Sequence, residues 1–146
     1  MQITFTLDRL NKIAHDVFLP LLKTHTIFAF VGPLGVGKTT LIKEIFKQCG
    51  VAEVVNSPTF GYVKSYKVSG ITYNHFDLYR LDSLDAFINA GFDEYLYAQD
   101  TLNFIEWPEI LDPLLQKSVL CEKVCYITIS YCSGFSGNKV KRVIRF

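Results

Sequence analysis

Apolar and polar positions divide the first third of the chain into a helix, a strand and a second helix. Apolar residues recur along one face of Asn11–Lys23, a spacing that predicts a helix, and Pro20 is placed to kink or end it. The continuous apolar run "TIFAFV", Thr26–Val31, predicts a strand that is buried on both faces. After a glycine-rich loop, Thr39–Cys49 predicts a helix, which Gly50 ends as a C-terminal cap.

The rest of the chain predicts a hairpin, a short helix and three further strands. Two strands, Phe60–Lys67 and Ile71–Phe76, flank a Ser-Gly pair that suits a tight turn. Ser83 is a suitable N-cap for the helix "LDAFINA". The remaining strands are expected at "LNFI" (102–105), "VCYITIS" (124–130) and "KVKRVIRF" (139–146), with the turn "SGFSGNK" before the last. This alternation predicts an α/β fold with an added β-hairpin.

Size and charge narrow the class of protein. The length of 146 residues fits a single domain over residues 1–146, and 49% hydrophobic residues are enough for a core. A net charge of +1 argues against a broad nucleic-acid-binding surface, which should be more basic. Neither a signal peptide nor an 18-residue apolar window is present, so we expect a cytoplasmic protein without membrane contact. The four cysteines form no C-x-x-C pair, so we expect free thiols and no zinc site.

The loop between the first strand and the second helix matches a phosphate-binding motif. Gly32, Gly37, Lys38 and Thr39 fit the pattern G-x-x-x-x-G-K-[ST], with a strand before it and a helix after it. Glycines let several backbone amides point inward at an anion, and the helix N-terminus adds unpaired N–H groups. Lys38 supplies a positive charge for the β- and γ-phosphates, and the Thr39 hydroxyl suits Mg²⁺. The alternative is a glycine-rich turn with an exposed lysine.

Two acids are candidates for a second magnesium partner, which such sites place at the end of a neighbouring strand. Glu106 ends the nearly all-apolar run "LNFI", as expected of a central strand, and Trp107 could shield it from water. Asp77 ends an alternating strand. Either acid could instead be a surface carboxylate. In "NSPTF", Thr59 is a candidate switch residue that senses the γ-phosphate, although the stretch could equally be an unoccupied Ser-Pro turn.

Four stretches together resemble one family. The segments "GPLGVGKTT", "NSPTF", "HFDLYRLDS" and "FIEWPE" occur in the order and spacing of TsaE proteins, formerly called YjeE. The resemblance covers nearly the whole chain, and "HFDLYRL" and "IEWPE" are far more specific than the glycine loop alone.

The resemblance implies a three-layer, P-loop NTPase-like fold with a mainly parallel central sheet, and a Mg²⁺-dependent ATPase that turns ATP into ADP and phosphate. TsaE proteins take part in tRNA threonylcarbamoyladenosine synthesis by acting on the TsaB–TsaD complex, so tRNA contact would be indirect and the chain alone a monomer. By family pattern Thr39 and Glu106 sit at Mg²⁺, Asp77 lies near the metal and the attacking water, and Thr59 belongs to a switch loop. The resemblance implies that the nucleotide contacts Thr6, Pro33, Leu34, Gly35, Val36, Gly37, Lys38, Thr39, Thr40, Glu109, Ser133 and Gly134.

The loop departs from the family at two positions. Pro33 and Val36 stand where family loops commonly have Asp and Ala. Because Pro33 has no N–H, one loop donor is absent, and we expect Val36 to narrow the room inside the loop. Both changes should alter nucleotide affinity and leave the reaction intact.

A loop of this kind also occurs in three other classes of protein. A GTPase would read guanine with N-K-x-D, but the nearest match, "NKVK" at residues 138–141, ends in Lys. A small-molecule kinase commonly has an arginine-bearing lid, whereas here only Arg80 is expected near the site. A module that binds nucleotide without significant turnover is harder to distinguish, because such sites often need a partner to complete them.

Overall fold

One mixed sheet forms the middle of the protein in the computed structural model, which describes residues 1–58, 60–132 and 140–146. Within these residues the strand order is β1-β7-β6-β2-β5-β4-β3. The central strands β6, β2, β5 and β4 are parallel, whereas β3, β7 and β1 join their neighbours antiparallel. The strands are β1 Gln2–Phe5, β2 Ile27–Val31, β3 Val63–Val68, β4 Ile71–Asp77, β5 Thr101–Glu106, β6 Val124–Tyr131 and β7 Arg142–Arg145.

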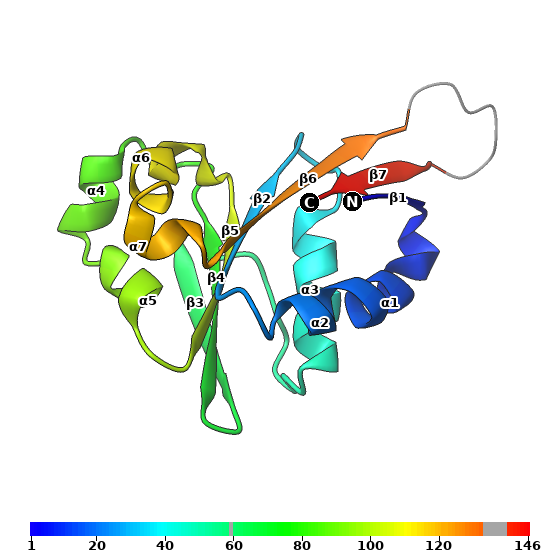
Figure 1. Cartoon of the computed structure of the whole chain (residues 1–146), viewed down its shortest axis with the longest axis horizontal. Coiled ribbons are helices and arrows are strands. Elements are labelled where there is room, and N and C mark those ends of the chain that lie inside the picture. Colours follow the sequence, from blue (N-terminus) through cyan, green and yellow to red (C-terminus); the bar gives the residue numbers. More distant parts are fainter. Residues whose placement is uncertain (59, 133–139) are drawn as a thin grey trace.

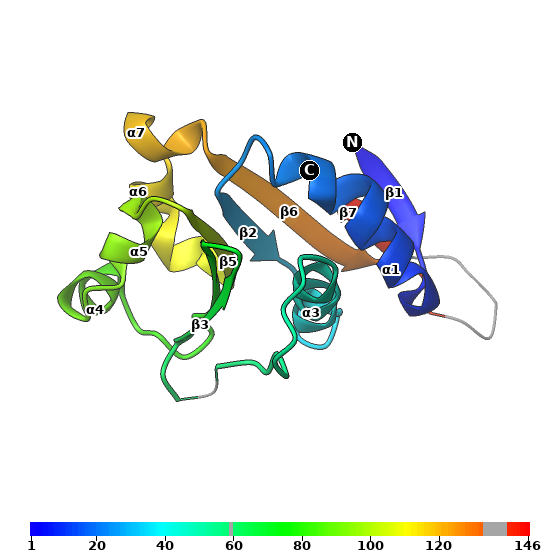
Figure 2. The same cartoon turned by 90° about the horizontal axis from the view of Figure 1, so that it is seen from below.

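Helices cover both faces of this sheet (Figures 1 and 2). One face carries η1 Leu7–Arg9, α1 Leu10–Ile13, η2 Ala14–Phe18, α2 Leu19–Leu21 and α3 Lys38–Gln48. The other carries α4 Leu84–Asn89, α5 Asp93–Tyr97, η3 Pro108–Leu111, α6 Asp112–Leu115 and α7 Ser118–Cys121. The three-layer α/β fold with a mainly parallel centre and an added hairpin, β3–β4, is therefore confirmed.

The central strands are apolar on both faces because each face meets a layer of helices. On β2, Phe28 and Phe30 belong to the core beneath α3, while Ile27 and Ala29 belong to the core on the other side. All four side chains are fully buried, as the apolar run predicts.

Aromatic rings fix α3 over the sheet. The ring of Phe104 on β5 lies 5.0 Å from that of Phe28 and 4.8 Å from that of Phe46 on α3, measured between centroids. The Phe46 ring also meets Tyr66 and Tyr73 of the hairpin edge-on, both at 5.6 Å. This packing holds the N-terminus of α3 at the carboxyl ends of β2 and β5.

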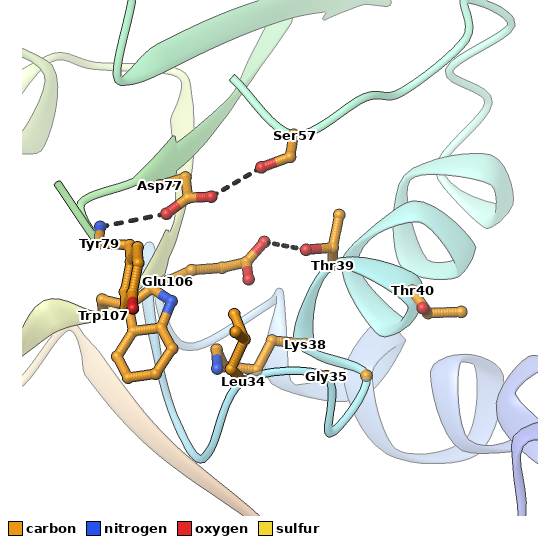
Figure 3. A pocket seen from close by; sticks show the side chains of 11 residues that line it. Leu34, Gly35, Lys38, Thr39, Thr40, Ser57, Asp77, Tyr79, Glu106 and Trp107 are labelled. Carbon is orange, nitrogen blue, oxygen red and sulfur yellow. Dashed lines mark hydrogen bonds between the residues drawn. The ribbon is translucent and has the colours of Figure 1, made fainter. Parts of the chain in front are cut away.

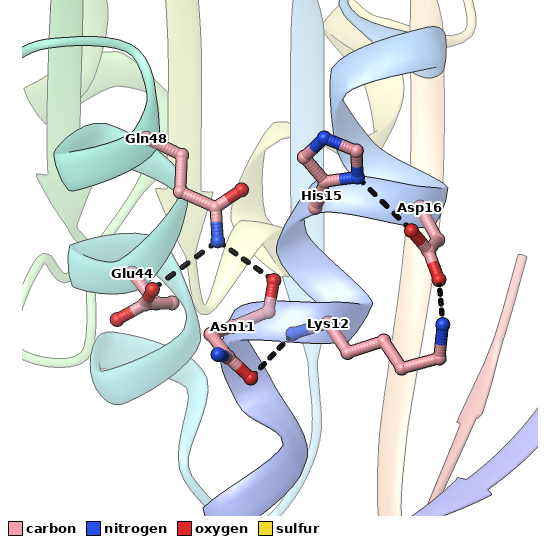
Figure 4. Close-up of polar contacts among 6 residues, drawn as sticks. All are labelled: Asn11, Lys12, His15, Asp16, Glu44 and Gln48. Atoms are coloured by element: carbon pink, nitrogen blue, oxygen red, sulfur yellow. Dashed lines mark hydrogen bonds and ion pairs between the residues drawn. The ribbon is translucent and has the colours of Figure 1, made fainter.

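The first helix is continuous from Leu10 to Leu21 but contains a π-helical segment, η2. The wide turn lies just before Pro20, which has no N–H for the usual bond to the fourth residue back. The predicted helix is confirmed, and it ends two residues early, after Pro20. Gln48 ties it to α3, because its Nε2 donates to the Asn11 carbonyl at 2.7 Å and to Glu44 Oε1 at 3.2 Å (Figure 4).

Local signals also predicted the hairpin and the fourth helix. Ser69 and Gly70 both have positive φ, 50° and 83°, as a type I′ turn requires. The Ser83 hydroxyl accepts the Ala86 amide at 3.1 Å, which confirms the cap. The strand expected from Phe60 begins only at Val63, because Tyr62 has a φ of 59°. The predicted turn at 133–139 lies outside the described residues.

The sequence did not predict β1, η1 and α5, nor the helical turns η3, α6 and α7 between residues 108 and 121. β1 forms by pairing with the far end of the chain, Gln2 opposite Arg145, which no local pattern reveals. The longest described helix, α3, has 11 residues, and no described helix combines the length and the apolar character that a bilayer crossing needs.

We expect Phe104→Ala to lower the free energy of unfolding by about 3–5 kcal/mol, because the substitution leaves a cavity between three aromatic rings. Phe60→Ala is the matched control, since that ring is 91% exposed and its loss should cost less than about 0.5 kcal/mol. Chemical denaturation of both variants measures the difference. Equal losses would contradict the aromatic core described here.

Candidate functional site

The loop after β2 takes a shape that only glycine permits at several positions. A Cβ at Gly32 would stand 2.3 Å from the Ile129 carbonyl oxygen of β6, so this residue lets the loop pass against the sheet. Gly35 and Gly37 have φ values of 75° and 111°, which side-chain-bearing residues rarely adopt. The loop therefore curls around its own amides and leads directly into α3.

The first turn of α3 offers donors to an anion. The amides of Lys38, Thr39 and Thr40 lie where an α-helix has no intrahelical carbonyl to accept them. The positive end of the helix dipole lies at the same point. This combination favours binding of a phosphate group.

Lys38 lies across the loop rather than in solvent. Its Nζ donates to the carbonyls of Gly32 at 2.6 Å and Pro33 at 3.1 Å, and stands 3.9 Å from the centroid of the Trp107 ring. Burial lowers the pKa of Lys38, while the nearby carboxylates of Glu106, Glu109 and Asp77 oppose that shift. The ammonium is therefore held by weak neutral acceptors, which a phosphate could replace with a stronger, charged partner.

Glu106 and Thr39 meet at the floor of the site. Glu106 is the last residue of β5 and shares a face with Phe104, so its side chain points toward α3. The Thr39 hydroxyl donates to Glu106 Oε1 at 2.7 Å, and the carboxylate is only 3% exposed (Figure 3). Of the two candidate acids, Glu106 is the one in contact with the motif threonine.

Asp77 lies beside Glu106 because the two end neighbouring parallel strands in register. Its carboxylate accepts the Ser57 hydroxyl at 2.7 Å and the Tyr79 amide at 3.1 Å. These bonds fix Asp77 at the cleft and connect it to the loop that precedes β3.

These groups line one cleft of about 280 Å³ (Figure 3). Trp107 adopts a left-handed backbone conformation, with φ 59° and ψ 57°, and its ring lies 4.9 Å from that of Tyr79. The cleft brings together the predicted residues Leu34, Gly35, Gly37, Lys38, Thr39, Thr40, Asp77 and Glu106, and adds Ser57, Tyr79 and Trp107. The Thr40 side chain points away from the Thr39–Glu106 contact in Figure 3.

The two unusual loop residues do not line this cleft. Val36 is fully buried in the core beneath the loop, and its Cγ1 lies 3.2 Å from where a Gly32 Cβ would stand, so a narrower loop interior stays a prediction. Its carbonyl accepts Arg142 Nε at 2.7 Å. Pro33 contributes a carbonyl to Lys38. Because its side chain is buried, any contact of Val36 with a nucleotide would come through the backbone, whereas Pro33 is exposed.

The remaining predicted residues lie at the margins. Thr6 precedes Leu7, whose Cδ2 approaches to 3.4 Å from where a Gly37 Cβ would stand, so this segment borders the loop. Glu109 is exposed on η3, and its carboxylate is near enough to raise the pKa of Lys38. Thr59, Ser133 and Gly134 lie outside the described residues, and their predicted roles stay predictions.

Sequence reasoning missed several polar neighbours of the site. The expectation that Arg80 is the only arginine near it is wrong, because Arg80 is exposed and does not line the cleft, whereas Arg142 supports the loop. His75 is fully buried next to Glu106. The alternation of β4 was the available signal for His75, since it places residue 75 on the same face as residue 77. Nothing in the local sequence indicates Arg142.

The oxygen donors suit a hard cation that keeps most of its water. Within the described residues no group of three or more His, Cys, Asp or Glu could enclose a metal ion. Mg²⁺ needs no such cage, because it takes one or two carboxylates together with water and phosphate oxygens. The Thr39 hydroxyl and the Glu106 carboxylate fit that requirement.

We expect Gly32→Ala to lower the free energy of unfolding by about 1–3 kcal/mol more than Gly91→Ala, since its Cβ would collide with the Ile129 carbonyl. Gly91 also has positive φ, 75°, but a Cβ there meets nothing within 4 Å. Denaturant titrations of the two variants measure this difference. Equal destabilisation would mean that the loop does not press on β6.

Comparison with known sequences points to one family. A model described as threonylcarbamoyl adenosine biosynthesis protein TsaE matches residues 6–134. A Rickettsia felis protein named tRNA threonylcarbamoyladenosine biosynthesis protein TsaE is 43% identical over 95 residues, covering 64% of this chain and 54% of the relative. The protein of that name from Rickettsia bellii is 37% identical over 124 residues, covering 78% and 85%. The match thus spans only about half the length of the first relative.

A solved structure agrees on the fold. The crystal structure of Bacillus subtilis YdiB superposes with a TM-score of 0.61 and covers 99% of this chain and 84% of its own. At 20% identity this likeness supports the fold alone. The family model spans most of the chain and the relatives exceed 30% identity, so the chain belongs to the TsaE family.

Proposed function

We propose that this protein binds ATP with Mg²⁺ and hydrolyses it to ADP and phosphate, as an accessory step in the synthesis of tRNA threonylcarbamoyladenosine. The observation that carries this proposal is the 2.7 Å contact between Thr39 and Glu106 beside Lys38, at the N-terminus of α3. A hydroxyl, a carboxylate and a lysine at a glycine loop are the groups that P-loop ATPases use.

The loop would hold the phosphates through its amides and Lys38. The ammonium would exchange the carbonyls of Gly32 and Pro33 for phosphate oxygens, and this exchange would move it off the Trp107 ring. Thr6 and residues 133–134 are proposed to enclose the adenosine, and Glu109 to lie near the nucleotide. Positive charge and amide dipoles fixed around the γ-phosphate favour the transition state over the ground state when negative charge shifts during transfer.

Thr39 and Glu106 would hold Mg²⁺, directly or through water. When bound, the ion would neutralise part of the phosphate charge. The residues themselves then have separate tasks. Thr39 offers its oxygen in place of the hydrogen bond to Glu106, and Glu106 contributes its carboxylate from a nearly dry position at the end of β5.

In the hydrolysis step, the oxygen of a water molecule bonds to the γ-phosphorus while the bond from that phosphorus to the β–γ bridging oxygen breaks. The protons of the water end on the phosphate product or in solvent, and ADP leaves. Asp77 or Glu106 orients this water. Asp77 is suited to the task because Ser57 and Tyr79 fix its carboxylate at the cleft. Thr59 would report the γ-phosphate to the neighbouring loop.

The proposed partner is the TsaB–TsaD complex, with tRNA contacted only indirectly. This assignment rests on family membership and on the relatives' names, which place them in tRNA threonylcarbamoyladenosine biosynthesis. Turnover by the isolated chain is expected to be slow, because a site of this kind often needs a partner to complete it. A nucleotide-dependent binding module remains the rival that turnover must exclude.

Glu106→Gln should keep ATP bound and slow hydrolysis by roughly 100-fold or more, since a neutral amide cannot replace the carboxylate at the cation. Phosphate release and equilibrium binding of labelled ATP measure the two effects separately. Glu122→Gln is the control, because Glu122 is exposed and precedes the amino end of β6, whereas the site lies at the carboxyl ends of the parallel strands. Unchanged turnover in Glu106→Gln would remove this acid from the chemistry.

ATP turnover should exceed that of a Lys38→Ala control, and should rise when purified TsaB and TsaD are added. The lysine variant is the reference because it removes the cation that compensates phosphate charge. Steady-state phosphate release with and without the two proteins checks both statements. If neither condition exceeds the Lys38→Ala rate, the ATPase assignment is wrong. The protein is then a module that binds nucleotide without turnover.

A further inference from the structure

Glu106 has a second buried neighbour, which the loop motif does not include. His75 lies on β4, is 0% exposed, and places its Nε2 2.8 Å from Glu106 Oε1. A carboxylate can only accept hydrogen bonds, so Nε2 carries the proton and donates it. This hydrogen bond fixes the orientation of the imidazole, with Nε2 facing Glu106.

The two oxygens of Glu106 have different surroundings. Oε1 accepts from both Thr39 Oγ1, at 2.7 Å, and His75 Nε2, at 2.8 Å. No residue in the described part of the chain donates to Oε2. Figure 3 shows that this second oxygen carries no contact among the cleft residues drawn. One oxygen is thus held in place while the other remains available to the cleft.

Packing alone does not explain a histidine at this position. Its ring contacts Phe46 edge-on, with centroids 6.3 Å apart, where an apolar side chain could pack equally well. Nδ1 is buried and finds no hydrogen-bond partner among residues 1–58, 60–132 and 140–146, which disfavours folding. In the described part of the chain, the one hydrogen bond that offsets this cost is the bond from His75 to Glu106.

We propose that His75 is a positioning residue for Glu106. If Thr39 turns its hydroxyl oxygen to a cation, as the proposed function requires, Glu106 Oε1 loses one of its two donors. His75 is then the donor that keeps the carboxylate from rotating, so that Oε2 continues to face the cleft. The expected effect of His75 on turnover rests on the proposed ATPase activity, but the hydrogen bond to Glu106 can be tested without nucleotide.

The first test is proton and ¹⁵N NMR of the unliganded protein. The three histidines, His15, His25 and His75, are distinguished by substitution. We expect a strongly downfield, slowly exchanging Nε2–H signal that disappears in His75→Leu, moves in Glu106→Gln, and is unchanged in the exposed control His15→Leu. A signal that is absent, or that does not respond to Glu106→Gln, overturns the proposal.

The second test is kinetic. His75→Leu should lower kcat about 10–100-fold, the usual loss when a group that orients a metal ligand is removed, while KM for ATP changes less than about threefold. His75→Gln should recover most of the activity, because its amide can still donate to the carboxylate. In a Glu106→Gln background, His75→Leu should cause little further loss, since the group it positions is already changed.

The outcomes distinguish a failure of the His75 proposal from a failure of the proposed ATPase function. Equal losses on His75→Leu in both backgrounds, or no recovery with Gln, would mean that the ring only packs against Phe46, and the proposal is overturned. If the wild type shows no turnover above Lys38→Ala, the ATPase assignment fails. The NMR signal and its dependence on Glu106 then still decide whether His75 holds this carboxylate.

Discussion

The burial of a carboxylate at the end of a hydrophobic strand is the constraint on which the site depends. Glu106 is only 3% exposed, and a charge in that position is very unfavourable unless donors surround it. Thr39 from α3 and His75 from β4 supply those donors from two separate elements. The carboxylate therefore links the helix that carries the phosphate-binding loop to the strand that carries Asp77.

The aromatic core makes this arrangement rigid. Phe104 stands two residues before Glu106 on the same face of β5, and its contact with Phe46 fixes α3 directly above that strand. The loop is held from the opposite side, where Gly32 passes against Ile129 and Arg142 binds the Val36 carbonyl. Within this frame Lys38 can change partners, because its ammonium is held by two neutral loop carbonyls and an indole face.

The parts of the site that could be predicted are those determined by residues close together in the sequence. The glycine loop, Lys38 and Thr39 follow from a motif of eight consecutive residues, 32–39. Glu106 follows from a short apolar run that ends in an acid. The alternation of β4 places His75 on the face of Asp77, but only the pairing of β4 with β5 shows that this face meets Glu106. Arg142 escaped prediction because it reaches the loop through the pairing of β7 with β6, where residue 142 stands beside 131. The burial of Val36 could not be predicted either, because its side chain packs into a core that only tertiary packing defines. The edge strand β1 exists only through its pairing with β7.

A crystal structure with a non-hydrolysable ATP analogue and Mg²⁺ tests the account most directly. It should show the β- and γ-phosphates against the amides of residues 35–40, Lys38 released from Gly32 and Pro33 onto phosphate oxygens, and the cation beside Thr39 and Glu106. An analogue bound elsewhere, or a loop that stays empty with Lys38 still on its own carbonyls at saturating analogue and Mg²⁺, would contradict it.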